Sequence, residues 1–298
     1  MERHEIETFL ALAQELHFRR TAERLHISSG RVSQTIAKLE RRIGSPLFER
    51  TSRHVQLTEI GRRLYDDIAP HHRAIQDAVA QATAAARDAH HTLRVGFLGP
   101  ATGAALSQVI NAYRDRHPGR EVQVILEAPL SDHVAALRDG VVDVMATMLP
   151  IEEPDLVVGP TVLREGRILA VPSGHPFAER DQITLEDLAG KAAIYAASPA
   201  PDYWQEYHHP TRTPSGRPIH RGPAVDTVQA GLTLIGAGQG IALATAQAGQ
   251  YFRRPDITYI PVTDGAPAEF VLVWAASAEN EHIRAFAAAA RGITPSGT

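Results

Sequence analysis

Apolar residues in the first part of the chain recur at the three- and four-residue steps that are typical of amphipathic helices. One run extends from Ile6 to Leu16, and a second, shorter run fits residues 19–25. A third run lies between Val32 and Ile43. The pattern predicts a small head of three short helices.

Clear sequence signals bound the third helix. Ser28 is suited to cap its start, because a serine hydroxyl accepts a hydrogen bond from a free amide one turn later. Gly44 can end the helix in a left-handed conformation, and Pro46 prevents its continuation. The face opposite the apolar stripe carries small, polar and basic residues: Ser29, Gly30, Arg31, Ser33, Gln34 and Lys38. Short hydroxyl side chains permit close approach, and Arg and Gln hydrogen-bond base edges in a DNA major groove.

The residues that follow predict a helix-turn-helix with a wing. The stretch "PLFERTSRHVQLT" has two short β-rich segments around a basic tip that holds Arg50 and Arg53, placed to contact phosphates or the minor groove. From His17 to Arg63 there are eleven Arg or Lys residues and four Glu residues, so this segment carries +7 and the rest of the chain −11. A basic segment on an acidic body indicates that one part meets a polyanion. The alternative is a small helical bundle whose charged face is solvated.

Composition narrows the class of protein. The chain has 298 residues, of which 44% are hydrophobic, so it is long enough for two or three folded units. It contains no cysteine, which excludes disulfides, thiolate metal sites and cysteine nucleophiles. The amino terminus has no apolar signal core, and no stretch approaches the length of a membrane span. We therefore expect a soluble cytoplasmic protein.

The first 65 residues resemble the winged helix-turn-helix of the LysR-type transcriptional regulators. The most specific matches are the series Ser33, Leu39-Glu40, Gly44 and Leu47-Phe48-x-Arg50, and the ending Leu57-Thr58-x-x-Gly61. Thr21 and Gly30 depart from the family, which usually has alanine and proline there. The polar face and the resemblance together imply a DNA-binding set: Arg19, Ser28, Ser29, Arg31, Ser33, Gln34, Lys38, Arg50 and Arg53.

A long helix is predicted from Thr58 to about residue 88. Its apolar side runs from Ile60 through Leu64, Ile68, Ile75 and Val79 to Ala86, and an exposed helix with such a stripe needs a partner. Pro70 is expected to bend or disturb it. The resemblance implies that this linker pairs with its copy in a homodimer. The alternative is packing against the chain's own body.

Beyond the boundary "ARDAHH" the chain alternates between β-rich and helical segments. The first three β-rich segments, with the helical segments between them, predict a parallel sheet with right-handed crossovers, and a second set of segments completes two α/β subdomains. The chain is expected to cross between them near Pro160–Arg164 and again near Val262–Pro267. The resemblance extends weakly to the end of the chain and implies a periplasmic-binding-protein-like effector domain.

The fold class is therefore multi-domain: an all-α winged helix-turn-helix head with a long linker helix, then an α/β effector domain of two Rossmann-like subdomains. The predicted boundaries are 1–58 for the head, 59–90 for the linker and 91–298 for the effector domain. Within the last, subdomain I comprises residues 91–162 and 266–298, and subdomain II residues 163–265.

A small-molecule effector is expected in the cleft between these subdomains. Gly99 and Pro100 open a helix whose free amides, with the Thr102 hydroxyl, can hold a carboxylate. Tyr203 and Trp204 lie in the segment "PAPDYWQEY" and are predicted to form an aromatic lid. The resemblance adds further cavity positions: Glu127, Thr147, Asp226, Thr227 and Thr245. Thr245 stands where many members of the family have proline.

No cofactor or metal is predicted. The glycine spacings miss the dinucleotide fingerprint and no phosphate-loop motif occurs. The fifteen histidines include the adjacent pairs His71-His72, His90-His91 and His208-His209, but adjacent side chains diverge and do not form a metal site.

We expect a LysR-type regulator that binds double-stranded DNA as a homodimer or a tetramer of two dimers, and whose operator binding or DNA bending an effector changes. The alternative is an enzyme with an accessory helix-turn-helix domain, which lacks a nucleophile–base pair or cofactor motif to support it. A third interpretation, a solute-binding protein for transport, is disfavoured because the sequence shows no signal peptide.

Overall fold

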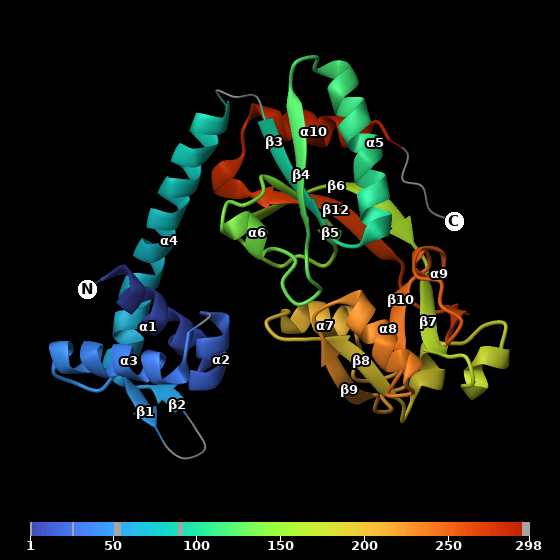
Figure 1. Cartoon of the computed structure of the whole chain (residues 1–298), viewed down its shortest axis with the longest axis horizontal. Coiled ribbons are helices and arrows are strands. Elements are labelled where there is room, and N and C mark those ends of the chain that lie inside the picture. Colours follow the sequence, from blue (N-terminus) through green and yellow to red (C-terminus); the bar gives the residue numbers. More distant parts are fainter. Residues whose placement is uncertain (1, 26, 51–54, 89–91, 294–298) are drawn as a thin grey trace. The chain divides into compact units, whose positions relative to one another are not determined.

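The computed structural model (Figure 1) describes residues 2–25, 27–50, 55–88 and 92–293. Contacts divide the chain into two compact units, Met1–Val79 and Ala80–Thr298, and each is described by itself. The first unit contains the predicted head and most of the linker helix. The second contains two lobes.

The head has three helices and a two-stranded antiparallel wing: α1 (Arg3–Glu15), α2 (Phe18–Arg24), α3 (Ser29–Ile43), β1 (Phe48–Arg50) and β2 (Val55–Leu57). Phe9, Val32 and Ile36 are fully buried at its centre. The ends of α3 are as predicted. The Ser28 hydroxyl accepts a hydrogen bond from the Arg31 amide (3.2 Å), and Gly44 closes the helix with φ of 81°.

A tight junction joins the head to the long helix α4 (Glu59–Asp88). The Glu40 carboxylate accepts hydrogen bonds from the backbone amides of Leu47 (2.9 Å) and Phe48 (3.3 Å). The Thr58 hydroxyl donates to the Pro46 carbonyl and accepts from the Gly61 amide, both at 2.9 Å. A Cβ atom on Gly61 would lie 2.1 Å from the Leu47 carbonyl oxygen, so only glycine permits this approach. The Leu-Thr-x-x-Gly ending of the head thus has a steric cause.

The apolar stripe of α4 divides into two parts, where the sequence pattern predicted one seam. Leu64 and Ile68 are half-buried and pack against the hydrophobic core of the head. Farther along, Ile75 and Val79 are each 62% exposed. Pro70 lies inside a helix that continues on both sides of it. The first part of the stripe therefore belongs to the head, whereas Ile75 and Val79 expose most of their apolar surface.

The first lobe is a five-stranded mixed sheet in the order β4-β3-β5-β12-β6. Its strands are β3 (Thr92–Phe97), β4 (Glu121–Glu127), β5 (Val144–Met148), β6 (Leu156–Glu165) and β12 (Ala268–Ala275). Strands β3, β4 and β5 are parallel, as predicted, whereas β12 runs antiparallel to β5 and β6. The helices are α5 (Pro100–Arg116), α6 (Ala135–Arg138) and α10 (Glu281–Arg291).

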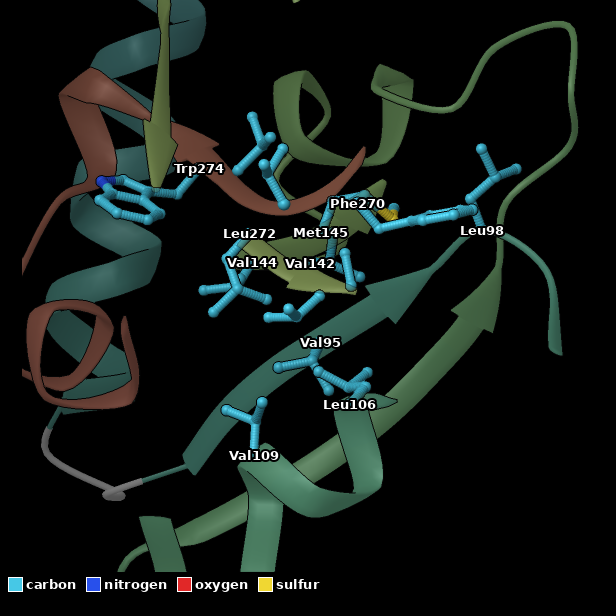
Figure 2. Close-up of a cluster of buried hydrophobic side chains, with 14 of the residues drawn as sticks. Val95, Leu98, Leu106, Val109, Val142, Val144, Met145, Phe270, Leu272 and Trp274 are labelled. Atoms are coloured by element: carbon cyan, nitrogen blue, oxygen red, sulfur yellow. The ribbon is translucent and has the colours of Figure 1, made fainter. Parts of the chain in front are cut away.

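The core of this lobe lies where α5 covers the sheet. Figure 2 shows Leu106 and Val109 of α5 beside Val95 of β3, with residues of β5 and β12 in the same cluster. All five residues of β5 are buried, which explains why four of them are apolar.

The second lobe contains an antiparallel sheet, β10-β7-β11, and a parallel pair, β8-β9. Its strands are β7 (Arg167–Pro172), β8 (Ala192–Ala196), β9 (His220–Val225), β10 (Ala242–Thr245) and β11 (Ile257–Val262). Its α-helices are α7 (Asp202–His208), α8 (Val228–Gly236) and α9 (Ala248–Tyr251). Short 3₁₀ helices cover Pro176–Glu179 and Leu185–Leu188 here, and Ala276–Ala278 in the first lobe.

Parts of this unit differ from what the sequence predicted or left open. Strands β6 and β9 were not predicted, β12 joins the first sheet antiparallel to β5 and β6, and the sheet around β7 is antiparallel. The first crossing lies at Gly166, between β6 and β7, so residues 163–165 belong to the first sheet. The second crossing, residues 263–267, agrees with the expected position. Periodicity predicts strands but does not determine which edge of a sheet a distant strand joins.

Candidate nucleic-acid interface and effector cavity

The polar face of α3 is open to solvent. Ser28, Ser29, Arg31 and Gln34 are exposed, and Ser33 is half-buried. On the other side of the helix, Val32, Ile36 and Leu39 are at most 1% exposed. The apolar stripe therefore fixes α3 against the head and leaves its first two turns free to enter a groove.

Two residues of the predicted DNA-binding set are held by carboxylates of the head. The Arg19 Nε atom lies 2.9 Å from Glu23 Oε1 in an exposed ion pair. Lys38 Nζ lies 3.0 Å from Oε1 of Glu5, a fully buried side chain. Lys38 is half-exposed beside Glu5, and its place in the DNA-binding set stays a prediction. The side chain of Arg50 and all of Arg53 lie outside the described residues.

Glu5 is a structural carboxylate that the sequence pattern did not single out. It accepts a hydrogen bond from the Glu2 amide (2.9 Å) and two from the Arg42 guanidinium (2.8 and 3.2 Å). The Glu2 amide, followed by Lys38 and Arg42, lowers the Glu5 pKa from 4.5 to about 2, although burial opposes the shift. The carboxylate thereby joins α1 to α3.

This lowered pKa predicts acid sensitivity of the head. A carboxyl group whose pKa is lower in the folded state stabilises the fold above its unfolded pKa, and this contribution is lost as the pH falls from about 4.5 towards 2. We expect Glu5→Gln to lower the melting temperature of the head at pH 7 and to flatten its dependence on pH below 5. Calorimetry of the full chain from pH 3 to 7 measures both. Glu7→Gln, which removes a carboxylate paired with the exposed Arg3, is the control. Equal behaviour of the two variants would contradict this role of Glu5.

The second unit contains a cavity of about 610 Å³. It begins between the lobes, at the start of α5 and the ends of β4 and β5, and continues into the second lobe between α8, α9 and the sheet. Most of its lining is apolar. Eight of the ten predicted effector residues line it: Gly99, Pro100, Thr102, Glu127, Trp204, Asp226, Thr227 and Thr245.

The polar residues at the mouth of the cavity come from both lobes. Thr102 is fully buried in the first turn of α5, and its hydroxyl has no hydrogen-bond partner among the described residues. The Thr227 hydroxyl caps α8 by accepting from the Ala230 amide (3.2 Å). Glu127 and Asp226 are exposed. The Leu130 amide donates to the Asp226 carbonyl (3.0 Å), so the lobes already touch at this point.

The predicted aromatic lid is wrong. Tyr203 and Trp204 lie in helix α7, and Trp204 is fully buried against the core of the first lobe, so it forms part of the cavity wall. Tyr203 does not line the cavity. Its hydroxyl donates to Glu153 Oε1 (3.0 Å), and burial raises its pKa to about 12. Thr147 is buried in β5 outside the lining, and the next residue, Met148, faces the cavity instead.

Sequence reasoning missed the buried charge of the cavity, Arg167. This residue starts β7, is 8% exposed and lines the cavity. Its Nε donates to the Ala266 carbonyl (3.0 Å), and its NH2 group lies 3.0 Å from His208 Nδ1. His208 Nε2 lies 2.8 Å from the Leu149 carbonyl, which requires the proton on Nε2 and leaves Nδ1 to accept from Arg167. Burial, followed by Arg167, holds the pKa of His208 well below its usual value, so this imidazole is neutral.

Comparison with known proteins decides the family. A model described as bacterial regulatory helix-turn-helix protein, lysR family, matches residues 4–62, and one described as LysR substrate binding domain matches residues 86–293. The chain belongs to the LysR family. It is a DNA-binding transcriptional regulator with an effector-binding domain, and not an enzyme.

Individual relatives span nearly the whole LysR chain. It is 30% identical to the regulator BenM of Acinetobacter baylyi over 89% of this chain and 86% of the relative. It is 29% identical to the regulator ShiR of Corynebacterium glutamicum over 88% of each. Among solved structures, full-length BenM has a TM-score of 0.52 at 24% identity, covering 98% of this chain and 96% of that one. CbnR in complex with its target DNA has a TM-score of 0.50 at 21% identity, covering 98% and 99%.

Within the part of the chain that the structure describes, none of the helices could span a membrane. The described residues also contain no cluster of three or more His, Asp or Glu side chains arranged to hold a metal ion.

Proposed function

We propose that this LysR-type regulator binds its operator through the first two turns of α3 as a dimer or a tetramer of two dimers, and that a small molecule in the cavity changes this binding or the bend of the DNA. The exposed polar start of α3, with an apolar face fixed on the head, carries the DNA-binding part of the proposal. The division into head (1–58), linker (59–90) and effector domain (91–298) belongs to the same proposal.

The assignment of residues at the DNA follows exposure and chemistry. Arg31 and Gln34 lie one helical turn apart on the open face and are placed to contact base edges. Ser28, Ser29 and Ser33 surround them with small side chains that allow close approach. Arg19, Arg50 and Arg53 carry positive charge suited to phosphates, which hold the protein in position without reading the sequence.

The linker supports dimerisation. Ile75 and Val79 expose apolar surface on one side of α4, which a second copy of the helix would bury. A symmetric pair of heads would place two recognition helices about 34 Å apart, one turn of DNA.

The cavity supports an effector because residues of both lobes line it and the chain crosses between the lobes twice. A ligand that contacts both lobes favours one arrangement of them over others, and it can act only by the difference in its affinity for those arrangements. We propose Gly99, Pro100, Thr102, Glu127, Trp204, Asp226, Thr227 and Thr245 as effector-facing residues.

The first test concerns base reading. We expect Gln34→Ala to weaken operator binding by about 1–3 kcal/mol and to relax the preference at one base pair, because it removes a bidentate hydrogen-bonding contact to a base. Once genomic mapping has located the operator, titrations with operator and scrambled DNA over a range of salt concentrations measure the affinity and the sequence preference. Gln14→Ala removes the same side chain from the exposed side of α1 and is the control. Unchanged sequence preference in Gln34→Ala would show that α3 does not read bases here.

A further inference from the structure

We propose that the effector is an amphipathic monoanion whose acidic group binds Arg167 and whose apolar body fills the arm of the cavity inside the second lobe. The inference rests on the proposed function and names the chemical class of the ligand. Its grounds are the charge on Arg167, the composition of the arm and the position of the carboxylates.

Arg167 is a buried cation whose hydrogen-bond partners among the described residues are uncharged. It bonds to a backbone carbonyl and to a neutral imidazole, and no described carboxylate lies within ion-pair distance of it. Glu165, two residues earlier, is also buried; its charge acts on Arg167 without an ion-pair contact, and its Oε2 accepts from the Gln247 amide (3.1 Å). A buried charge without an ion-pair partner is costly, and a bound anion removes much of that cost. An arginine fork also matches the geometry of a carboxylate.

The guanidinium is held in place before any ligand arrives. The Ala266 carbonyl fixes Nε, and the imidazole of His208, itself anchored on Leu149, fixes NH2. A Cβ atom on Gly265 would lie 3.0 Å from Arg167 Cβ and Cγ, so the backbone there packs closely against the arginine stem. A donor that is already ordered loses little entropy on binding, which favours it as the anchor.

The arm of the cavity accepts an apolar body. It is lined by Ile194, Leu232, Ile235, Phe252 and Tyr259, with Ala170 and Ala242 leaving space on the sheet. Ala170 pairs with both Ala242 and Tyr259 in the sheet register. Arg167 starts the same strand, β7, and both residues line the one cavity, so an acidic group at Arg167 and an apolar body in the arm can belong to a single ligand.

The distribution of charge limits the ligand to one acidic group. The carboxylates that line the cavity, Glu127 and Asp226, are exposed at its mouth, whereas the guanidinium is buried. A second anionic group on the ligand would therefore point towards two carboxylates. A cation would find Arg167 at the inner position. A monoanion can place its one charge at Arg167 and leave only uncharged groups near Glu127 and Asp226.

The experiment is a matched ligand series with the full-length protein. The probes are phenylacetate, cyclohexanecarboxylate and hexanoate as monoanions, phenylacetamide as a neutral analogue, phenethylamine as a cation and glutarate as a dianion. Calorimetric titration gives the dissociation constants, and the melting temperature without ligand reports on folding. We expect binding by monoanions, tightest for those with a ring, and at least tenfold weaker binding by the other classes. Absence of binding by every monoanion, or preference for the neutral, cationic or dianionic probe, would overturn the proposal.

Two sets of variants test the role of Arg167 and the role of the apolar arm separately. Arg167→Gln should weaken binding of the best monoanion about 30-fold or more, because it removes one partner of a buried charged pair. Arg167→Lys should restore part of the affinity, and Arg164→Gln, at an exposed arginine outside the lining, should leave it unchanged. Ala242→Leu should weaken ring-bearing probes more than hexanoate, whereas Ala193→Leu, on the neighbouring strand outside the lining, should not. Wild-type affinity in an Arg167→Gln protein of normal melting temperature would overturn the role of Arg167.

The result also separates this inference from the proposed function. Monoanions that bind but leave operator affinity and DNA bending unchanged would contradict effector control while supporting the ligand class. An operator response to glutarate or phenethylamine alone would support effector control and contradict the ligand class.

Discussion

Ile75→Glu combined with Val79→Glu is expected to convert the regulator to a monomer and to lower operator affinity about 10²–10⁴-fold, because two linked heads bind far more tightly than one. Both side chains are 62% exposed on one side of α4, so the carboxylates would repel each other across a helix pair without disturbing the core of the head. Light scattering measures the mass, and titration of operator DNA measures the affinity.

The control for this pair is Ala74→Glu, an exposed position on the same helix away from the stripe. Glu substitutions at Leu64 and Ile68 would not serve, because those residues pack against the head and their loss would unfold it. An unchanged mass for the Ile75 and Val79 double variant would show that this part of α4 is not the dimer contact.

The second large effect is a pair of glycine substitutions with opposite signs. Gly61→Ala should destabilise the head by about 1–3 kcal/mol or more, because the new Cβ would lie 2.1 Å from the Leu47 carbonyl oxygen and the backbone must shift. Gly30→Ala should stabilise the head by about 0.5–1 kcal/mol. Position 30 is exposed in α3, and the nearest atom to its new Cβ, the Ser28 hydroxyl, would be 3.9 Å away.

Denaturant unfolding of the full chain, followed by a probe in the head, gives both changes in free energy. If Gly61→Ala is as stable as the wild type, the close approach at the junction is not a constraint on the fold.

The sequence predicts most of what local patterns control. The caps of α3 at Ser28 and Gly44 and the long linker helix follow from spacing and capping chemistry, which depend on residues one or two turns apart. The polar face of α3 follows for the same reason. Lys38 shows the limit, because its partner Glu5 lies 33 residues earlier and only the packing of α1 on α3 brings them together.

The cavity illustrates the same limit more strongly. Family positions such as Thr102 and Asp226 line it, but Arg167 was missed because its importance comes from burial beside His208, which is distant in sequence. Trp204 was predicted as a lid because its segment was expected to be a loop. In the structure the segment forms a short helix, and the indole is more stable in the core of the first lobe than in water.

The junction at Gly61 has a mechanical consequence. The hydrogen bond that Glu40 accepts and the one that the Thr58 hydroxyl donates, together with the contacts of Leu64 and Ile68, hold the start of α4 to the head. We therefore expect the head and this first part of the linker to turn as one body. In the proposed dimer, the angle between two paired linkers would then set the phase at which the two recognition helices meet the double helix.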